Sequence, residues 1–113
     1  VRGGHLEGET IRQLNDYRAS RGLKRLAVDP ILTAQARGWS AHMANGGGFR
    51  HSEANVFENI AMHSNANSGT FFNQWKNSRG HDRNMLDTGV NKVGVGIAHD
   101  AEGRAYATMQ LSR

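Results

Sequence analysis

The C-terminal fifth of the chain carries the pattern that most restricts the possible fold. Two runs of alternating residues, 92–98 and 104–111, flank the turn-rich segment HDAEG at 99–103. The inward positions are apolar: Val93, Val95 and Ile97 in the first run, and Ala105, Ala107, Met109 and Leu111 in the second. This pattern predicts a β-hairpin with one face packed against helices.

Segments with helical spacing precede this hairpin. Asp29 followed by Pro30 predicts a helix start, because the carboxylate can cap free backbone amides and proline suits the first helical turn. Asn67 or Ser68 is expected to cap a later helix. Helices are predicted over residues 8–21, 30–44, 70–77 and 81–86, and a short strand over 55–62. Helices followed by a hairpin predict an α+β sandwich rather than a parallel, doubly wound sheet.

The length of 113 residues fits one core, so a single domain over residues 1–113 is expected. The sequence has no cysteine, which excludes a disulfide scaffold and thiolate metal ligands, so any metal must be held by nitrogen and oxygen. No apolar run reaches the roughly 18 residues of a membrane span, and VRGGHLEGET lacks the features of a signal peptide. Because the chain begins without Met, we expect a mature or trimmed fragment.

Positive charge is concentrated in the first half of the chain. Residues 1–50 hold eight Lys or Arg against four Asp or Glu, whereas residues 51–113 hold six of each. The excess gathers at Arg18, Arg21, Lys24 and Arg25. One interpretation is a patch for anionic polymers, and the other is a solvated helix end that favours the helix dipole. Nucleic acid is the less expected partner, because this run lacks interleaved aromatic residues.

Two glycines in the first hairpin strand, Gly94 and Gly96, need a separate explanation. A dinucleotide-binding fingerprint would need a third glycine and a following helix, and neither is present. We therefore expect these glycines to let another backbone or an aromatic ring approach the strand closely.

Two histidines and one glutamate form the best candidate for chemistry. His51 and Glu58 belong to the run FRHSEANVFENIAMH, and His81 follows the helix-breaking Ser-Arg-Gly at 78–80. Glu58 lies in an apolar setting where its charge needs a partner, and histidine can provide one. Two imidazoles with a carboxylate and water would suit zinc, although the spacing matches no compact zinc motif.

A serine hydrolase is the alternative that the same residues leave open. Ser52 or Ser78 would be the nucleophile and His81 the base. No G-x-S-x-G elbow is present, and Ser78 can equally be a helix-capping residue.

Several motifs occur in a characteristic order over about residues 11–111. They are LNDYRASRGL at 14–23, an Ala-rich helix with Trp39, His51-Ser52, ENIA at 58–61, W-x-N-S-x-G-H-x-x-N-M-L at 75–86 and VGVGI at 93–97. This set resembles the CAP superfamily of cysteine-rich secretory proteins, antigen 5 and plant pathogenesis-related proteins. The similarity is to its short bacterial branch, the SCP-like domains.

The resemblance implies a three-layer α-β-α sandwich with a small antiparallel sheet, and a secreted or cell-surface location. It also implies a cleft with two His and two Glu, which binds zinc or another divalent ion in some members. By position, His51 and His81 are the metal ligands and Glu58 is one Glu, whereas Ser78 stands where many members have the second. The cleft residues expected are Glu58, Asn59, Ser78 and Trp75.

Two functions follow from the resemblance and the residues together. The first is a monomeric, secreted binding module whose cleft at His51, Glu58 and His81 holds a weakly bound divalent ion or a small, lipidic or cell-wall ligand. The second is a metal-assisted, peptidase-like hydrolase in which Glu58 is the catalytic general base. Electrostatic binding of anionic polymers is a third hypothesis.

Overall fold

The computed structural model describes residues 2–67 and 69–113. Ser68, one of the two expected helix caps, lies outside the described residues. The elements in chain order are α1 (Arg2–Ser20), β1 (Ala27–Val28), α2 (Pro30–His42), η1 (Met43–Gly47), β2 (Phe57–His63), α3 (Thr70–Lys76), α4 (Arg79–Met85), β3 (Lys92–His99) and β4 (Ala105–Ser112).

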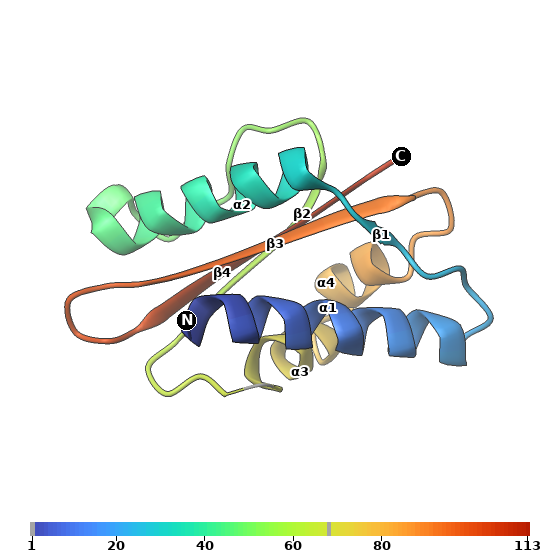
Figure 1. The fold of residues 1–113 in the computed structure, drawn as a ribbon, viewed down its shortest axis with the longest axis horizontal. Coiled ribbons are helices and arrows are strands. Elements are labelled where there is room, and N and C mark those ends of the chain that lie inside the picture. The colour runs from blue at the N-terminus through green and yellow to red at the C-terminus, as the bar shows by residue number, and fades with distance from the viewer. Residues whose placement is uncertain (1, 68) are drawn as a thin grey trace.

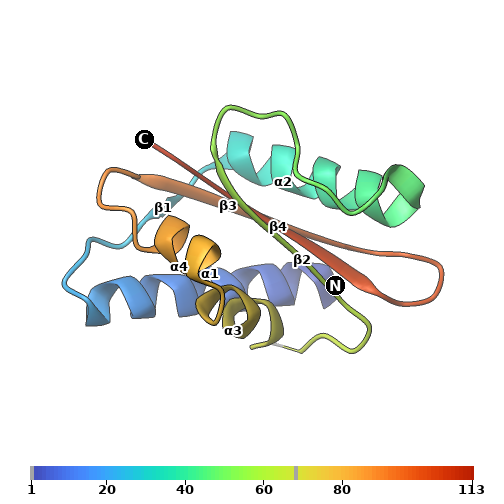
Figure 2. The same cartoon turned by 180° about the vertical axis from the view of Figure 1, so that it is seen from behind.

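The strands form one sheet between two helical layers. Helix α2 covers one face, and α1, α3 and α4 cover the other, as the two opposite views show (Figures 1 and 2). The strand order is β1-β3-β4-β2, with β3 and β2 both antiparallel to β4. This arrangement confirms the predicted α-β-α sandwich and the C-terminal hairpin.

One edge of the sheet adds a short parallel pair to the predicted antiparallel sheet. Strand β1 pairs in parallel with β3, through Ala27 with Lys92 and Val28 with Val93. The sequence pattern predicts no strand between residues 21 and 30. A two-residue strand shows no alternation, so only its pairing with β3 makes it a strand.

Two helices begin earlier than predicted. Helix α1 begins at Arg2 rather than at residue 8, and α4 begins at Arg79 rather than at residue 81. The predicted cap of α2 is confirmed, since the Asp29 carboxylate accepts a hydrogen bond of 2.9 Å from the backbone N–H of Leu32. Beyond α2 the chain forms the wider turn η1, where Gly46 has a φ of 96°.

Gly94 and Gly96 bring α2 directly onto the sheet, as expected. A Cβ atom on Gly96 would lie 2.1 Å from the backbone nitrogen of Arg37, and one on Gly94 would lie 2.3 Å from that of Thr33. The contact is reinforced by Ser40, whose hydroxyl donates to the Gly96 carbonyl at 2.8 Å. Helix α2 is therefore fixed to β3 with almost no space between their backbones.

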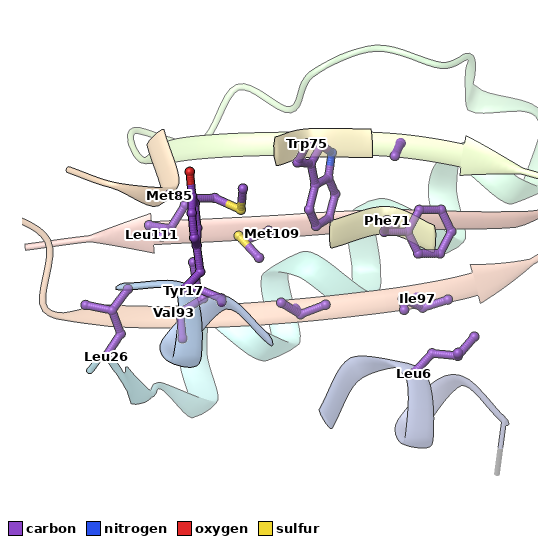
Figure 3. Close-up of a cluster of buried hydrophobic side chains, with 14 of the residues drawn as sticks. Leu6, Tyr17, Leu26, Phe71, Trp75, Met85, Val93, Ile97, Met109 and Leu111 are labelled. Carbon is purple, nitrogen blue, oxygen red and sulfur yellow. The ribbon is translucent and has the colours of Figure 1, made fainter. Parts of the chain in front are cut away.

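The main core fills the opposite face, between the sheet and α1, α3 and α4. Figure 3 shows Trp75, Phe71, Met85 and Tyr17 packed over Val93, Met109 and Leu111 of the strands. Trp75 is only 1% exposed, and its indole N–H donates to the Ile60 carbonyl at 3.0 Å. Its predicted place in the cleft is wrong, because the ring lies in the core and satisfies a backbone carbonyl of β2.

One of the four residues of the predicted basic patch is not on the surface. Arg18 is fully buried and donates to the carbonyls of Lys24, Met85 and Asp87, so it joins the end of α1 to the end of α4. Arg25 is paired with Asp16 at 3.0 Å. Burial of Arg18 and pairing of Arg25 reduce the free positive charge at this helix end, which weakens the hypothesis of anionic-polymer binding.

Candidate functional site

Glu58 is positioned by the pairing of strands β2 and β4. In this register Glu58 lies opposite Gln110, and Gln110 lies opposite Gly94 of β3. All three positions therefore face α2, because side chains in one cross-strand row share a face of the sheet. The Glu58 residue is 9% exposed and Gln110 is 1% exposed.

Each oxygen atom of the Glu58 carboxylate accepts two hydrogen bonds, which makes four in all. Oε1 accepts from Nδ1 of His51 at 2.9 Å and from the backbone N–H of Ser52 at 2.8 Å. Oε2 accepts from the Ser52 hydroxyl at 2.5 Å and from the Gln110 amide at 2.9 Å. Burial alone would raise the pKa of Glu58, but these hydrogen bonds outweigh burial and hold the pKa below its ordinary value.

The ionised Glu58 determines how His51 presents its ring. A carboxylate can only accept, so the Nδ1 atom of His51 carries the proton and Nε2 keeps its lone pair. The side chain of His51 is 57% exposed, which leaves Nε2 accessible. Glu58 thus orients His51, and its own oxygen atoms have no free acceptor position with which to act as the predicted general base.

His81 approaches the same place from the other helical layer. Asn59, which is fully buried on the next position of β2, donates from Nδ2 to the His81 carbonyl at 3.2 Å. Asn84 in turn donates to Oδ1 of Asn59 at 2.9 Å. Asn59 therefore fixes α4 against β2 rather than offering a free polar group to a ligand.

The ring of His81 is half-buried and incompletely satisfied. Its Nδ1 atom is shielded from solvent and has no hydrogen-bond partner in the described part of the chain. Burial lowers the pKa of His81, and the nearby His51 lowers it further. His51 and His81 are attached to adjacent residues of the edge strand β2, His51 to Glu58 and the His81 carbonyl to Asn59. The lowered pKa of His81 favours its neutral ring at pH 7.

Ser78 precedes α4, three residues before His81. It occupies the N-cap position, but its side chain makes no capping hydrogen bond. Its backbone carbonyl accepts a hydrogen bond of 2.8 Å from the backbone N–H of Asp82. Residues three apart at a helix start are neighbours, so a side chain at this position can reach toward the ring of His81.

The donor set available to a divalent ion is small. No group of three His, Asp or Glu side chains within residues 2–67 and 69–113 is arranged to hold a metal. Glu58 is occupied by its four donors, so the fitting ligands are the free Nε2 of His51 and a ring nitrogen of His81. Two imidazole nitrogens suit zinc or a similar ion, but they leave other coordination positions to water or to a ligand.

A family model for the cysteine-rich secretory protein family, CAP, matches residues 11–111. The chain belongs to the CAP family. The expected membership is thereby confirmed, and the match covers the elements from α1 to β4 that build the site. No curated protein sequence matches this CAP domain at a significant level.

Solved structures share the fold at low sequence identity. An extracellular protein with an SCP domain from Bacillus anthracis is 19% identical, with a TM-score of 0.74, over 98% of this chain and 41% of that one. A cysteine-rich secretory protein from Staphylococcus aureus is 16% identical, with a TM-score of 0.76, over 98% and 39%. The CAP domain thus spans about two fifths of these two chains.

A third similar structure is that of NaASP2 with Zn²⁺. It is 16% identical, with a TM-score of 0.70, and the match covers 95% of this chain and 78% of that one. At these identities the likeness establishes the fold, which is the CAP α-β-α sandwich.

Sequence reasoning did not identify Gln110 as part of the site. Gln110 lies on the face that alternates with Met109 and Leu111, and the three-layer sandwich that the resemblance implies would cover this face as well. A buried amide needs a hydrogen-bonding partner. Only the pairing of β2 with β4 shows that this partner is Glu58.

Proposed function

We propose that this CAP domain is an extracellular binding module that binds a divalent cation weakly through His51 and His81, beside strand β2. The observation that carries the proposal is that two histidines are held at adjacent residues of β2, His51 by Glu58 and His81 by Asn59. The bond from Nδ1 of His51 to Glu58 leaves Nε2 of His51 free, and His81, whose Nδ1 is buried without a partner among the described residues, would bind through Nε2.

The surrounding residues keep both rings ready to act as ligands. Ionised Glu58 holds His51 in the tautomer that presents Nε2, which is the usual role of a carboxylate behind a metal-binding histidine. The lowered pKa of His81 keeps that ring neutral, as a metal ligand must be. A bound divalent ion would supply a Lewis acid for an oxygen atom of a small ligand.

The names of similar proteins support an extracellular location. CAP-domain proteins are typically extracellular, and the matched chains from Bacillus anthracis and Staphylococcus aureus are described as an extracellular and a secretory protein. The zinc complex of NaASP2 supports the choice of zinc as the first ion to test. Among the described residues, no helix is both long and apolar enough to cross a membrane.

Calorimetric titration of chelator-treated protein with zinc tests the proposal. We expect binding that weakens at least tenfold in His51→Ala and in His81→Ala, because each variant removes one of two protein ligands. His63→Ala is the matched control, since His63 ends β2 but lies away from the pair. Binding that is absent from the native protein, or that survives both substitutions, would exclude the metal site.

Hydrolysis remains a separate hypothesis that this geometry favours less. A general base needs a free acceptor position toward water, and Glu58 has none among its four hydrogen bonds. Ser52 also donates its hydroxyl proton to Glu58 rather than to His81. A peptide and ester screen with added zinc would establish catalysis only if turnover were abolished by His81→Ala.

A further inference from the structure

The segment that carries His51 is held at very few points. Residues 48–56 connect η1 to β2 without helix or strand, and within them the described backbone–backbone hydrogen bonds include only that from Val56 to Ala54. Gly48, where the segment begins, has a φ of 93°. The position of His51 must therefore depend on side chains that reach the segment from elsewhere.

One such attachment lies immediately before His51. The indole N–H of Trp39 donates to the Arg50 carbonyl at 2.8 Å, and the Arg50 guanidinium stacks on the same ring, 5.1 Å from its centroid. On α2, His42 packs against Trp39 with a centroid distance of 4.9 Å. His42 in turn lies on the backbone of Gly47, where a Cβ atom would come within 2.3 Å of its ring.

The second attachment lies immediately after His51. The Glu58 carboxylate accepts from both the backbone N–H and the hydroxyl of Ser52. His51 is thus the single residue between two anchored neighbours, one held by α2 and the other by β2.

The first anchor is itself rigid. Ser40, the residue after Trp39, is fully buried and donates to the Gly96 carbonyl of β3. Its hydroxyl also lies 2.8 Å from that of Thr108 on β4. The backbone of Trp39 is therefore fixed to the sheet, and its indole N–H can transmit that fixed position to Arg50.

We propose that Trp39 is a positioning residue for His51. Through its hydrogen bond to the Arg50 carbonyl it holds the backbone that places the His51 ring against Glu58, opposite His81. The inferred effect of Trp39 on the His51–Glu58 hydrogen bond does not depend on ion binding. Its effect on ion binding rests on the proposed function. The indole contributes through one N–H group, so a variant that keeps the ring but lacks this group tests the proposal.

The first measurement uses metal-free protein and the ¹⁵N chemical shifts of the histidine rings. In the native chain we expect His51 to be in the Nδ1–H form, as its bond to Glu58 requires. In Trp39→Phe we expect averaging of the two tautomers at His51, while the signals of His63 stay unchanged. Arg50→Ala keeps the carbonyl acceptor and is the matched control, so His51 should retain its native tautomer. Unchanged His51 signals in Trp39→Phe would overturn the proposal.

The second measurement is a double-mutant cycle with zinc titration. Loss of one neutral hydrogen bond is worth about 1 kcal/mol, so Trp39→Phe should weaken binding by about three- to tenfold. In the His51→Ala background the same substitution should have no further effect. An equal loss in both backgrounds would show a merely structural role and overturn the proposal. If native protein binds no zinc, the proposed function fails and the ring shifts alone decide this inference.

A further variant protects the test against misfolding of Trp39→Phe. Site-specific β-(3-benzothienyl)alanine at position 39 keeps the bicyclic shape and replaces the indole N–H by sulfur. It should reproduce the tautomer change with little loss of thermal stability. Native His51 signals in this variant would show that the N–H group does not position the ring.

Discussion

The side-chain amide of Gln110 donates a hydrogen bond of 2.9 Å to Oε2 of Glu58 across neighbouring strands, inside the layer between the sheet and α2. This contact links the hairpin, which the C-terminal sequence pattern predicts, to the carboxylate that orients His51. Because Gln110 is almost fully buried, its amide and the carboxylate depend on each other for hydrogen bonding.

Replacing Gln110 by Met should therefore destabilise the domain. The variant keeps a similar volume but removes one of four donors to a buried carboxylate, a loss of about 1–3 kcal/mol in the free energy of unfolding. Urea unfolding at pH 7 measures it. Gln74→Met, at an exposed position of α3, should change stability by less than about 0.5 kcal/mol and serves as the control. Equal effects of the two substitutions would contradict the role of Gln110.

The lowered pKa of Glu58 predicts a loss of stability in acid. A carboxylate whose pKa is lower in the folded than in the unfolded state stabilises the fold above its ordinary value of 4.5. That contribution disappears as the pH falls through the lower folded-state pKa. Native protein should thus lose unfolding free energy below about pH 5. In Glu58→Gln the curve should be flatter over the same range, and parallel curves would show that other carboxyl groups dominate.

The close contact between β3 and α2 predicts opposite effects of alanine at two glycines. Gly96→Ala should cost about 2–3 kcal/mol, because its Cβ atom would overlap the backbone of α2 at Arg37. Gly38→Ala lies within α2 with nothing inside 4 Å of the added atom, so it should stabilise the domain by about 0.5–1 kcal/mol. Thermal unfolding of both variants checks this, and a neutral Gly96→Ala would mean that α2 can move away from the sheet.

Because Nδ1 of His81 has no partner in the part of the chain that the structure describes, we predict that a carboxylate can be added beside it. Ser78→Glu places an acceptor three residues before His81 and should tighten zinc binding about tenfold, because a carboxylate behind a ligand histidine raises its basicity. Asn77→Glu adds the same charge one residue earlier and is the control for a general electrostatic gain. If both variants tighten zinc binding alike, the orientation of His81 is not the cause.

Much of this architecture could be predicted from local patterns. The hairpin, the Asp29–Pro30 start of α2 and the close approach at Gly94 and Gly96 all depend on residues near one another in the chain, and each is confirmed. Strand β1 could not be predicted, because two residues carry no periodic signal and acquire strand geometry only by pairing with β3. Trp75 was misplaced for a similar reason, since its helical pattern showed an apolar face without showing which surface that face covers.

The sequence by itself determined which chemical groups this CAP domain can use. Without cysteine, only His and carboxylate side chains are available as strong metal ligands, and His51, Glu58 and His81 were identifiable by type and context. The tertiary structure alone decided their roles. By pairing β2 with β4 and folding residues 48–56 against Trp39, it surrounds Glu58 with four donors and turns it into the group that orients His51. Among the described residues, the same fold leaves the Nδ1 atom of His81 without a hydrogen-bond partner, because hydrogen bonding depends on which distant residues meet.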